Sequence, residues 1–333
     1  MKDGILNINK PKEMTSFDVV HLLRKKLGIK RIGHLGTLDP MAEGVLPVAL
    51  GKAARVMDYL GLDMKEYIAE FIFGVSTDTD DIWGRELALS EGGSVECKEN
   101  LESADIGITR EKVEASLKSF LGVTEQVPPN YSALKVDGKK MYEYARKGQE
   151  IEKKAREVYI PSIGVLDFGE RSVEEFDGRV FKYAVLRILC GKGTYIRSIA
   201  RDLGKILGVG SCMSSLIRTK SGAFDISESI KLDDILELSE ERIEELMVSP
   251  DMALSAFPKT VIGGWEEKLF KNGVCLRSDQ WKGDTSENNN LKEFPLKLPE
   301  DYYNSYRVYG DEGFVGIGVL QEDGGLKAKK VLV

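Results

Sequence analysis

The stretch that decides the fold runs Gly33-His-Leu-Gly-Thr-Leu-Asp-Pro-Met-Ala-Glu-Gly-Val-Leu-Pro47. Its glycines and prolines punctuate the chain, so backbone conformation rather than a hydrophobic stripe must set its shape. Asp39 lies between the apolar residues Leu38 and Pro40, which predicts a carboxylate held in a partly dry place. The loop alone leaves an alternative open, in which Asp39 is the N-cap of a helix.

Regular elements flank this loop. Before it, Thr15-Ser16 predicts the start of a helix and Gly28 predicts its end. Apolar residues at helical spacing are expected to form the buried face of that helix, namely Phe17, Val20, Leu23 and Leu27. After the loop we expect a helix over 53–60 and then a strand from Tyr67, where side chains alternate with a period of two.

The rest of the chain divides into a large and a small part. Residues 78–106 read as a loop, 113–121 as a helix, 182–190 as a strand, and the helix after Gly191-Lys-Gly-Thr194 is expected to be capped by Thr194. An acidic helix over 232–247 is expected to close the large part. The remaining expectations are a linker at 250–258, a polar and mobile insertion at 278–304, and strands at 306–309 and 314–320 joined by tight turns.

Composition narrows the class of protein. With 333 residues, 42% apolar and 30% charged, the chain is expected to form folded domains. The N-terminal apolar run is too short for a signal peptide, and no stretch approaches the roughly 20 apolar residues of a membrane span, so we expect a cytoplasmic protein. Four scattered cysteines and two histidines argue against a disulfide framework and a metal site.

The charge pattern favours a polyanionic partner despite a net charge of −7. Basic residues concentrate at 24–31, at 135–156, and in a series between Arg187 and Lys220. Such islands can follow a phosphate backbone. The alternative is that each island is an ordinary solvated surface.

Two further residues could take part in the chemistry of a site. Arg197 follows Gly191-Lys-Gly-Thr-Tyr-Ile and could pair with a carboxylate, although it could equally be a surface arginine at a helix start. Tyr67 could act in a site or pack in the core. Residues 44–52 lack the spacing of a phosphate-binding loop, and His34 has no serine elbow to make a hydrolase. The residues alone indicate a site without metal or cofactor, built from a carboxylate, an arginine and an aromatic ring near basic surface.

Several long motifs, in order, resemble the TruB family of bacterial tRNA pseudouridine synthases. They are Asn9-Lys10-Pro11 with Thr15-Ser16, the loop 33–47, Lys65-Glu-Tyr67, Pro128-Pro-Asn-Tyr-Ser-Ala-Leu-Lys135 with Gly138-Lys-Lys-Met-Tyr-Glu-Tyr-Ala-Arg146, Gly193-Thr-Tyr-Ile-Arg-Ser-Ile-Ala-Arg-Asp-Leu-Gly204, and Leu216-Ile-Arg218. The tail from about 261 onward is similar, more weakly, to a PUA domain.

The resemblance implies a mixed α/β (α+β) pseudouridine synthase core over 1–250, with a thumb-like arm at about 127–156. A small C-terminal β-barrel, PUA-like and RNA-binding, would occupy 258–333. The implied reaction isomerises uridine 55 in the tRNA T-loop to pseudouridine. Its implied partner is the tRNA T-loop and T-stem, with no membrane, no obligatory protein partner, no cofactor, no metal, and a monomeric state.

The resemblance also implies a role for each matching residue. Asp39 would be the nucleophile or otherwise assist cleavage, Arg197 would pair with Asp39 and keep it ionised, and Tyr67 would stack on the target base. The remaining contacts would come from His34 wedged in the T-loop, Tyr195 and Leu216 beside the uracil, Lys10 under the Asp39 loop or on a phosphate, and Lys135, Lys139, Lys140 and Arg146 on the RNA.

Two other functions remain open at this stage. The first is a non-catalytic protein that binds or folds tRNA with the same surfaces. The second is a related synthase of different RNA specificity. Retention of Asp39, Tyr67 and Arg197 together favours the enzyme, because a pure binder gains nothing from a carboxylate that faces phosphates.

Overall fold

The protein contains two compact units in the computed structural model, which describes residues 3–60, 64–87, 107–132, 134–136, 138–145, 147, 149, 153–283 and 295–332. Unit 1 comprises Met1–Pro40, Gly44–Asp63 and Lys220–Val333, and unit 2 comprises Met41–Glu43 and Met64–Thr219. Each unit is described by itself. No helix among the described residues is long and apolar enough to cross a membrane.

A small sheet organises the N-terminal part of unit 1. Strand β1 (Gly4–Lys10) runs antiparallel to β3 (Glu43–Leu50) along its whole length. Strand β13 (Ile230–Lys231) pairs with β1 in parallel, and β2 (Ile32–His34) pairs with β3. Nearly every residue of β1 and β3 is buried, including the polar residues Asn7 and Lys10, so these strands are core elements of unit 1.

Helix α1 (Ser16–Leu27) begins and ends at the predicted residues. Thr15 and Asp18 form a capping box, and Gly28 ends the helix with φ 64°. Val20, Leu23 and Leu27 are buried as expected, but Phe17 is 63% exposed. The prediction for Phe17 is wrong because Ser16 and Val19 occupy the buried side of the first turn.

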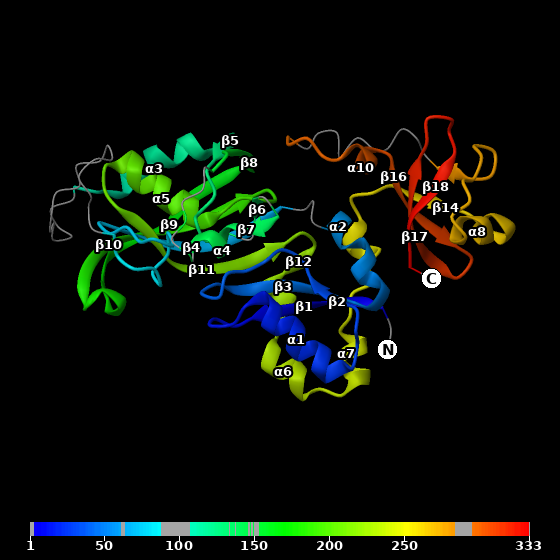
Figure 1. Ribbon diagram of the computed structural model, residues 1–333, viewed down its shortest axis with the longest axis horizontal. Helices are drawn as coiled ribbons and strands as arrows, with labels where there is room; N and C mark the ends of the chain where they lie inside the picture. The colour runs from blue at the N-terminus through cyan, green and yellow to red at the C-terminus, as the bar shows by residue number, and fades with distance from the viewer. Residues whose placement is uncertain are drawn as a thin grey trace. The chain divides into compact units, whose positions relative to one another are not determined.

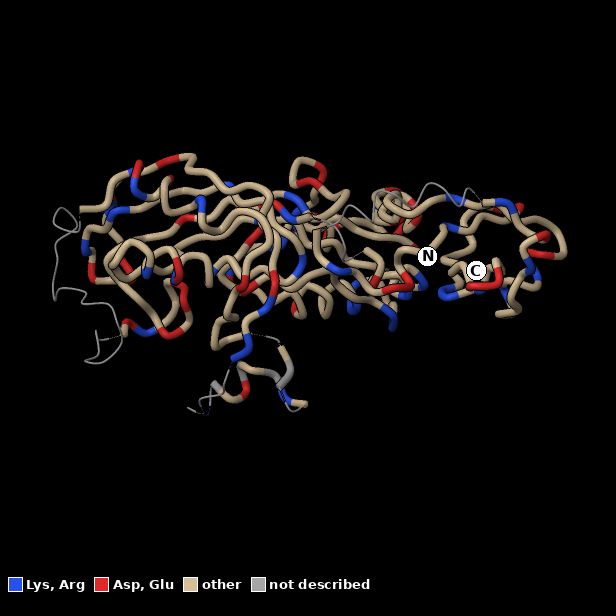
Figure 2. Tube along the Cα trace, turned by 90° about the horizontal axis from the view of Figure 1, so that it is seen from above, with Lys and Arg blue, Asp and Glu red and all other residues tan. Residues whose placement is uncertain are grey.

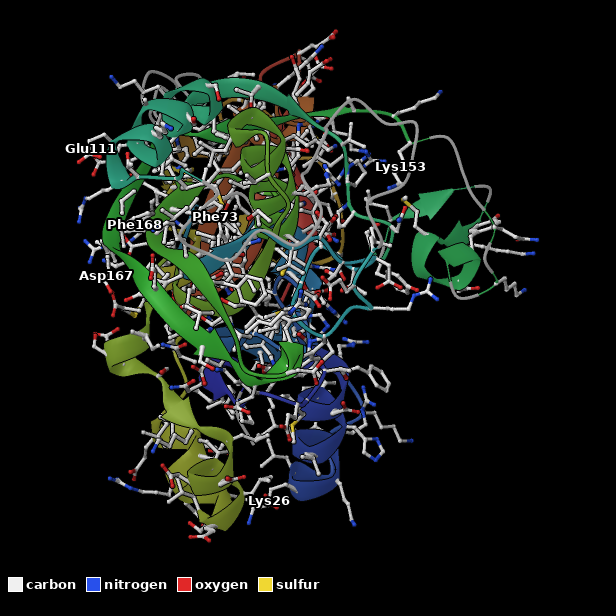
Figure 3. All side chains as sticks on the ribbon, turned by 90° about the vertical axis from the view of Figure 1, so that its left-hand side faces the viewer. Lys26, Phe73, Glu111, Lys153, Asp167 and Phe168 are labelled. Carbon is white, nitrogen blue, oxygen red and sulfur yellow. The ribbon has the colours of Figure 1, made fainter. Side chains whose placement is uncertain are left out.

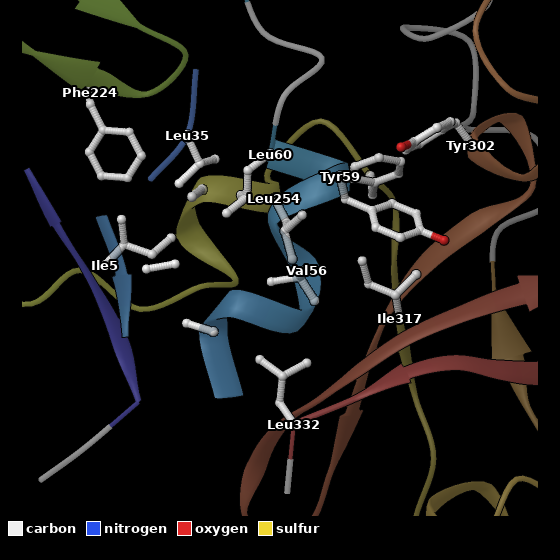
Figure 4. Packing of buried hydrophobic residues seen from close by; sticks show 14 of the residues in the cluster. Ile5, Leu35, Val56, Tyr59, Leu60, Phe224, Leu254, Tyr302, Ile317 and Leu332 are labelled. Atoms are coloured by element: carbon white, nitrogen blue, oxygen red, sulfur yellow. The ribbon is translucent and has the colours of Figure 1, made fainter. Parts of the chain in front are cut away.

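The hydrophobic core of unit 1 includes residues that lie far apart in the sequence (Figure 4). The predicted helix at 53–60 is a 3-10 helix, η1 (Gly51–Val56), followed by α2 (Met57–Leu60). The ring of Tyr59 packs edge-on against Phe257 and Tyr302, with centroids 5.6 and 4.8 Å apart. The expected linker therefore carries buried core residues, with Leu254 and Phe257 nearly inaccessible.

The C-terminal strands of unit 1 form a five-stranded sheet in the order β15-β14-β16-β17-β18 (Figure 1). Both predicted strands are present and joined by tight turns. The described strands leave the sheet open, so the expected closed barrel is not seen. Leu276, on the segment that leads into the edge strand β15, nevertheless pairs with Leu326 of β18, the strand at the other edge, while β15 pairs with β14. The strands are β14 (Lys259–Val261), β15 (Lys282–Gly283), β16 (Ser305–Gly310), β17 (Gly313–Leu320) and β18 (Leu326–Val331).

The polar insertion is only partly as predicted. Residues 284–294 lie outside the described residues. The end of the insertion forms α10 (Glu300–Tyr303), and Tyr302 is buried in the core, so mobility is the wrong prediction for this end. The predicted acidic helix is two short helices, α6 and α7. Unit 1 further contains β12 (Phe224–Asp225), η5 (Ile226–Glu228), α6 (Leu232–Glu237), α7 (Glu240–Glu245), η6 (Met252–Leu254) and α8 (Gly264–Lys271).

Unit 2 is built on four strands in the order β11-β4-β10-β9. Strand β4 (Lys65–Phe73) pairs antiparallel with β10 (Arg179–Cys190), and β10 pairs antiparallel on its other side with β9 (Ser162–Val173). Helix α3 (Arg110–Leu117), extended by η3 (Lys118–Phe120), packs against β9 and α5. The remaining elements of the sheet layer are η4 (Glu174–Phe176), α5 (Ile196–Leu207) and β11 (Ser211–Ser221).

Helix α5 lies very close to the start of β11. A Cβ atom added to Gly204 would stand 2.6 Å from the Cβ of Ser211 and 2.8 Å from its backbone nitrogen. Only glycine allows this approach, which holds α5 in a defined place on the sheet.

The predicted arm projects from unit 2 (Figures 2 and 3). It leaves from β5 (Gly122–Gln126) and returns through β8 (Arg156–Ile160), and these two strands pair along their whole length. The described part of the arm holds a short hairpin, β6 (Lys135–Val136) with β7 (Lys139–Lys140), followed by α4 (Met141–Ala145). Ser132 and Met141 are buried and in contact, so the start of α4 is held against the segment that precedes the hairpin.

Candidate active site

The loop that carries Asp39 is held by the backbone on both sides of that residue. The hydroxyl of Ser16 accepts a hydrogen bond from the Leu38 nitrogen at 2.8 Å and donates to the Leu38 carbonyl at 3.1 Å. On the other side, the Glu13 nitrogen donates to the Pro40 carbonyl at 2.8 Å. We call these contacts the Asp39 bracket. They fix a half-buried carboxylate without any hydrophobic stripe.

The alternative of a helix N-cap at Asp39 is wrong. The described residues after Asp39 form a turn and then enter β3. The loop instead begins and ends on the paired strands β2 and β3. Its two ends are joined by a hydrogen bond from the Leu35 nitrogen to the Pro47 carbonyl at 2.8 Å. Asp39 therefore belongs to a closed loop between β2 and β3.

Lys10 and His34 lie near the two ends of this arrangement. Lys10 is fully buried, and its Nζ donates to the carbonyls of Pro11 and Met14 at 2.7 and 2.6 Å. It thereby stabilises the turn that supplies Glu13 to the Asp39 bracket. His34 is half-buried at the end of β2, opposite Val48 of β3.

In unit 2, Tyr67 and Leu216 are buried on adjacent strands. Tyr67 is 7% exposed on β4 and lies opposite Ile188 of β10. Leu216 is equally inaccessible on β11. Burial on the sheet is compatible both with a pocket wall and with the core role that the sequence left open.

Arg197 lies in the first turn of α5, as predicted, but is not a surface arginine. It is 5% exposed, and its guanidinium donates to the carbonyls of Thr79 and Tyr131 at 3.1 and 3.0 Å. Nη1 also lies 3.6 Å from a carboxylate oxygen of Asp81. Three acceptors thus orient one buried guanidinium.

The helix cap differs from the prediction. Tyr195 is the N-cap residue, whereas the Thr194 hydroxyl donates to the Gly191 carbonyl. The amide of Gln126 replaces a capping side chain, since it accepts from the Tyr195 nitrogen at 2.8 Å and donates to the Tyr195 carbonyl at 3.1 Å. The end of β5 therefore sets the position of Tyr195.

Sequence reasoning missed Asp81. It is nearly buried, and its Oδ1 accepts from the Thr79 hydroxyl at 2.8 Å and from the Trp83 nitrogen at 3.1 Å. The segment lies within the stretch predicted to be an irregular loop, and no periodicity marks it. The signal that could have found it is Thr77-Asp-Thr-Asp-Asp81, a cluster of short polar side chains typical of a tight turn.

A second ion pair lies beside the first. Arg201 Nη1 is 3.1 Å from Asp80, and Arg201 also donates to the carbonyl of Val127 at the base of the arm. Burial raises the pKa of Asp80, while the positive charges of Arg201 and Arg197 act in the opposite direction. Two adjacent carboxylates thus meet two arginines spaced one helical turn apart.

Three of the four lysine and arginine residues predicted to contact RNA lie on the described part of the arm. Lys139 is exposed on the hairpin, and the backbones of Lys135 and Lys140 lie on its two strands. Arg146 lies outside the described residues.

Two observations concern other kinds of site in the described part of the chain. No group of three His, Cys, Asp or Glu residues that could hold a metal occurs there. Burial raises the pKa of Cys190 to about 12, which keeps that thiol protonated and poorly nucleophilic.

Comparisons with known proteins agree with the motifs. Residues 24–196 match the family described as "TruB family pseudouridylate synthase (N terminal domain)", and residues 197–255 match "tRNA pseudouridylate synthase B C-terminal domain". A protein named tRNA pseudouridine synthase B from Clostridium novyi is 40% identical over 332 residues, with 99% of this chain and 100% of the relative covered. One of the same name from Bacillus cereus is 41% identical over 278 residues, with 83% and 85% covered.

Solved structures support the fold. A structure titled "Structure of H/ACA RNP bound to a substrate RNA containing 2'-deoxyuridine" superposes with a TM-score of 0.67 at 22% identity, covering 99% of this chain and 85% of the other. An archaeal box H/ACA sRNP complex gives the same TM-score and identity, with 99% and 86% covered. The two family domains and the 40% identity over nearly the full length of a relative establish the assignment: the chain belongs to the TruB family of pseudouridine synthases.

Proposed function

We propose that this tRNA pseudouridine synthase isomerises uridine 55 in the T-loop of tRNA, with Asp39 as its essential carboxylate. The Asp39 bracket carries the proposal. It presents a half-buried carboxylate at a fixed place in a loop, because Leu38 is bonded to Ser16 at the start of α1 and Pro40 is bonded to Glu13 in the preceding turn. Such a carboxylate suits a reaction that needs one oriented acid group.

The proposed reaction begins with extrusion of the target nucleotide from the T-loop. Unstacking costs a few kcal/mol, and stacking on Tyr67 returns on the order of 1–3 kcal/mol. Asp39 then attacks the ribose C1′ or otherwise assists cleavage of the C1′–N1 bond. The freed uracil rotates and rejoins the ribose through C5. As the C1′–C5 bond forms, any bond from Asp39 to C1′ breaks, the C5 proton is lost to water, and N1 takes up a proton. If cleavage proceeds by elimination instead, Tyr67 is the candidate base that removes a ribose proton and later returns it.

Arg197 is proposed to pair with Asp39. A guanidinium beside a partly buried carboxylate favours its ionised form. The buried contacts of Arg197 with Asp81, Thr79 and Tyr131 support this role because they hold the guanidinium in one orientation. His34 is proposed to fill the space left by the flipped nucleotide, and Tyr195 and Leu216 to line the uracil pocket.

The domain assignment belongs to the same proposal. We infer a catalytic domain over 1–250 with its arm at 127–156, and a PUA-like RNA-binding domain over 258–333. The pairing of Leu276, on the segment that leads into the edge strand β15, with Leu326 of the opposite edge strand β18 supports a barrel-like arrangement. Cytoplasmic location and action as a monomer without a protein partner complete the proposal.

The deciding experiment compares wild type with Asp39→Asn on a T-arm hairpin. The variant keeps size and polarity but removes the charge. We expect it to form no pseudouridine in an assay that measures tritium release from C5 of the uridine, while its affinity for the hairpin stays within about threefold. Full turnover by the variant would refute Asp39 as the essential group. A wild-type protein that binds the hairpin but converts no uridine would favour the non-catalytic binder.

A further inference from the structure

We infer that the exposed face of α1, headed by Phe17, is a docking surface for the tRNA strand that adjoins the target uridine. Its position follows from the Asp39 bracket. Ser16, which bonds to Leu38 on both its nitrogen and its carbonyl, directly precedes Phe17. The first turn of α1 is therefore directly bonded to the loop to which the RNA must bring a nucleotide. This step rests on the proposed role of Asp39.

Phe17 presents its ring to solvent at this place. It is 63% exposed, while its neighbours Ser16 and Val19 are buried. A single exposed apolar side chain needs no explanation elsewhere on a surface. Here the ring belongs to the residue next to Ser16, which bonds to the loop of the candidate carboxylate. An aromatic face is also the surface on which an unpaired base stacks.

The same face continues with groups that suit phosphate. His21 and Lys25 are exposed and follow Phe17 at intervals of four residues, so the three share one side of the helix over roughly 12 Å. From Ser16 to Arg31 the chain has five basic residues and one acidic residue. That acid, Asp18, is bonded to Thr15 in the capping box.

Charge also indicates which side of α1 the RNA occupies. The acidic helix α6 packs beside α1, and Lys26 lies at the end of α1 on the side toward α6 and α7 (Figure 3). A phosphate backbone is repelled from that acidic side. An aromatic ring followed by basic groups matches a nucleic-acid strand, so we assign the face of Phe17, His21 and Lys25 to RNA.

The test measures binding to a T-arm hairpin that already contains pseudouridine. This product is not consumed, so the result does not depend on Asp39. We expect Phe17→Ala to weaken binding about tenfold with an unchanged salt slope, and Phe17→Trp to retain binding. Lys25→Ala should instead lower the salt slope by about one. The matched control is Leu166→Ala, because Leu166 is an apolar residue of unit 2 that is 47% exposed.

Each outcome decides. Equal affinity for wild type and Phe17→Ala, with both folded by thermal melting, overturns the proposal. So does an affinity loss shared by Leu166→Ala. Self-association that depends on Phe17 in the absence of RNA would assign the face to contacts between copies and also overturn it. Failure of Asp39→Asn to lose activity, with Phe17→Ala still impaired in binding, would refute the proposed catalytic role alone.

Discussion

Asp81 is the residue whose contacts most sharply predict an effect on turnover. Its carboxylate pairs with the buried Arg197, and replacement by asparagine removes the charge while leaving an oxygen for Thr79 and Trp83. We expect Asp81→Asn to lower single-turnover rates by about tenfold to a hundredfold, because a guanidinium that shifts by an ångström loses its alignment. Affinity for tRNA should change little.

The matched control for Asp81 is Asp202→Asn. Asp202 binds Arg201, one helical turn beyond Arg197, with Nε 2.8 Å from Oδ1. It should leave the single-turnover rate near that of wild type. Equal losses for the two variants would mean that the charge cluster acts through stability instead of through Arg197.

At the same scale, the sequence identified Arg197 but misjudged its surroundings. Glycine-rich spacing and a helix start were enough to place the residue in the first turn of α5. Its burial depends on carbonyls of residues 79 and 131, which are distant in sequence and carry no side-chain signal. Phe17 failed for a related reason. Helical periodicity allows it on the buried face, and only the contacts of Ser16 and Val19 decide otherwise.

Among the elements, α1 has a testable start. Thr15→Ala removes the capping box, and we expect it to lower the free energy of unfolding by about 1 kcal/mol, the usual cost of losing an N-cap hydroxyl. Chemical denaturation measures the difference. Thr109→Ala is the matched control, since Thr109 caps α3 through a single bond and should cost less.

The capping box also predicts a pH effect. The hydrogen bond from the Thr15 hydroxyl lowers the pKa of Asp18 below its ordinary 3.8. A carboxyl with a lowered pKa in the folded state stabilises the fold above 3.8, and this contribution is lost as the pH falls through the folded-state value. The stability difference between wild type and Asp18→Ala should therefore narrow below pH 3.8. A difference that widens on acidification would contradict the assignment.

The contribution of the arm to RNA binding can be measured from the salt dependence of tRNA affinity. Lys139 is exposed on the hairpin of β6 and β7. Replacing Lys139 and Lys140 by alanine should weaken tRNA binding and reduce the salt slope by about one for each phosphate that the variant no longer binds. Lys118→Ala, an exposed lysine at the end of α3, is the control. A salt slope equal to that of wild type would remove the arm from the interface.

For the molecule as a whole, the C-terminal sheet and the N-terminal part of unit 1 share one core. Tyr302 is central to it, since its ring contacts Tyr59 and its hydroxyl donates to the Asp58 carbonyl at 3.0 Å. We expect Tyr302→Ala to cost about 3 kcal/mol or more in unfolding free energy. Tyr302→Phe, which loses only the hydrogen bond, should cost about 1 kcal/mol. If the sheet melts separately in wild-type calorimetry, this shared core does not couple them.

That core explains which part of the architecture the sequence revealed. Alternating and helical patterns identified β4, β10, α1 and α5 because each has a local period. Residues 250–258 have no such period, so they read as a linker although Leu254 and Phe257 pack inside. Tyr302 is likewise not predicted as a core residue, because the stretch before it is polar and has no local period. Burial that depends on a distant partner leaves no local trace.

The Asp39 bracket has a kinetic consequence. The residues on both sides of the carboxylate are already bonded to the first residue of α1 and to the turn before it, so this loop has little conformational freedom left to lose when RNA arrives. Substrate mixing should therefore show no slow isomerisation of the protein at this place. Opening of the T-loop is then the rate-limiting conformational step, and the flipped nucleotide meets a carboxylate that is already in position.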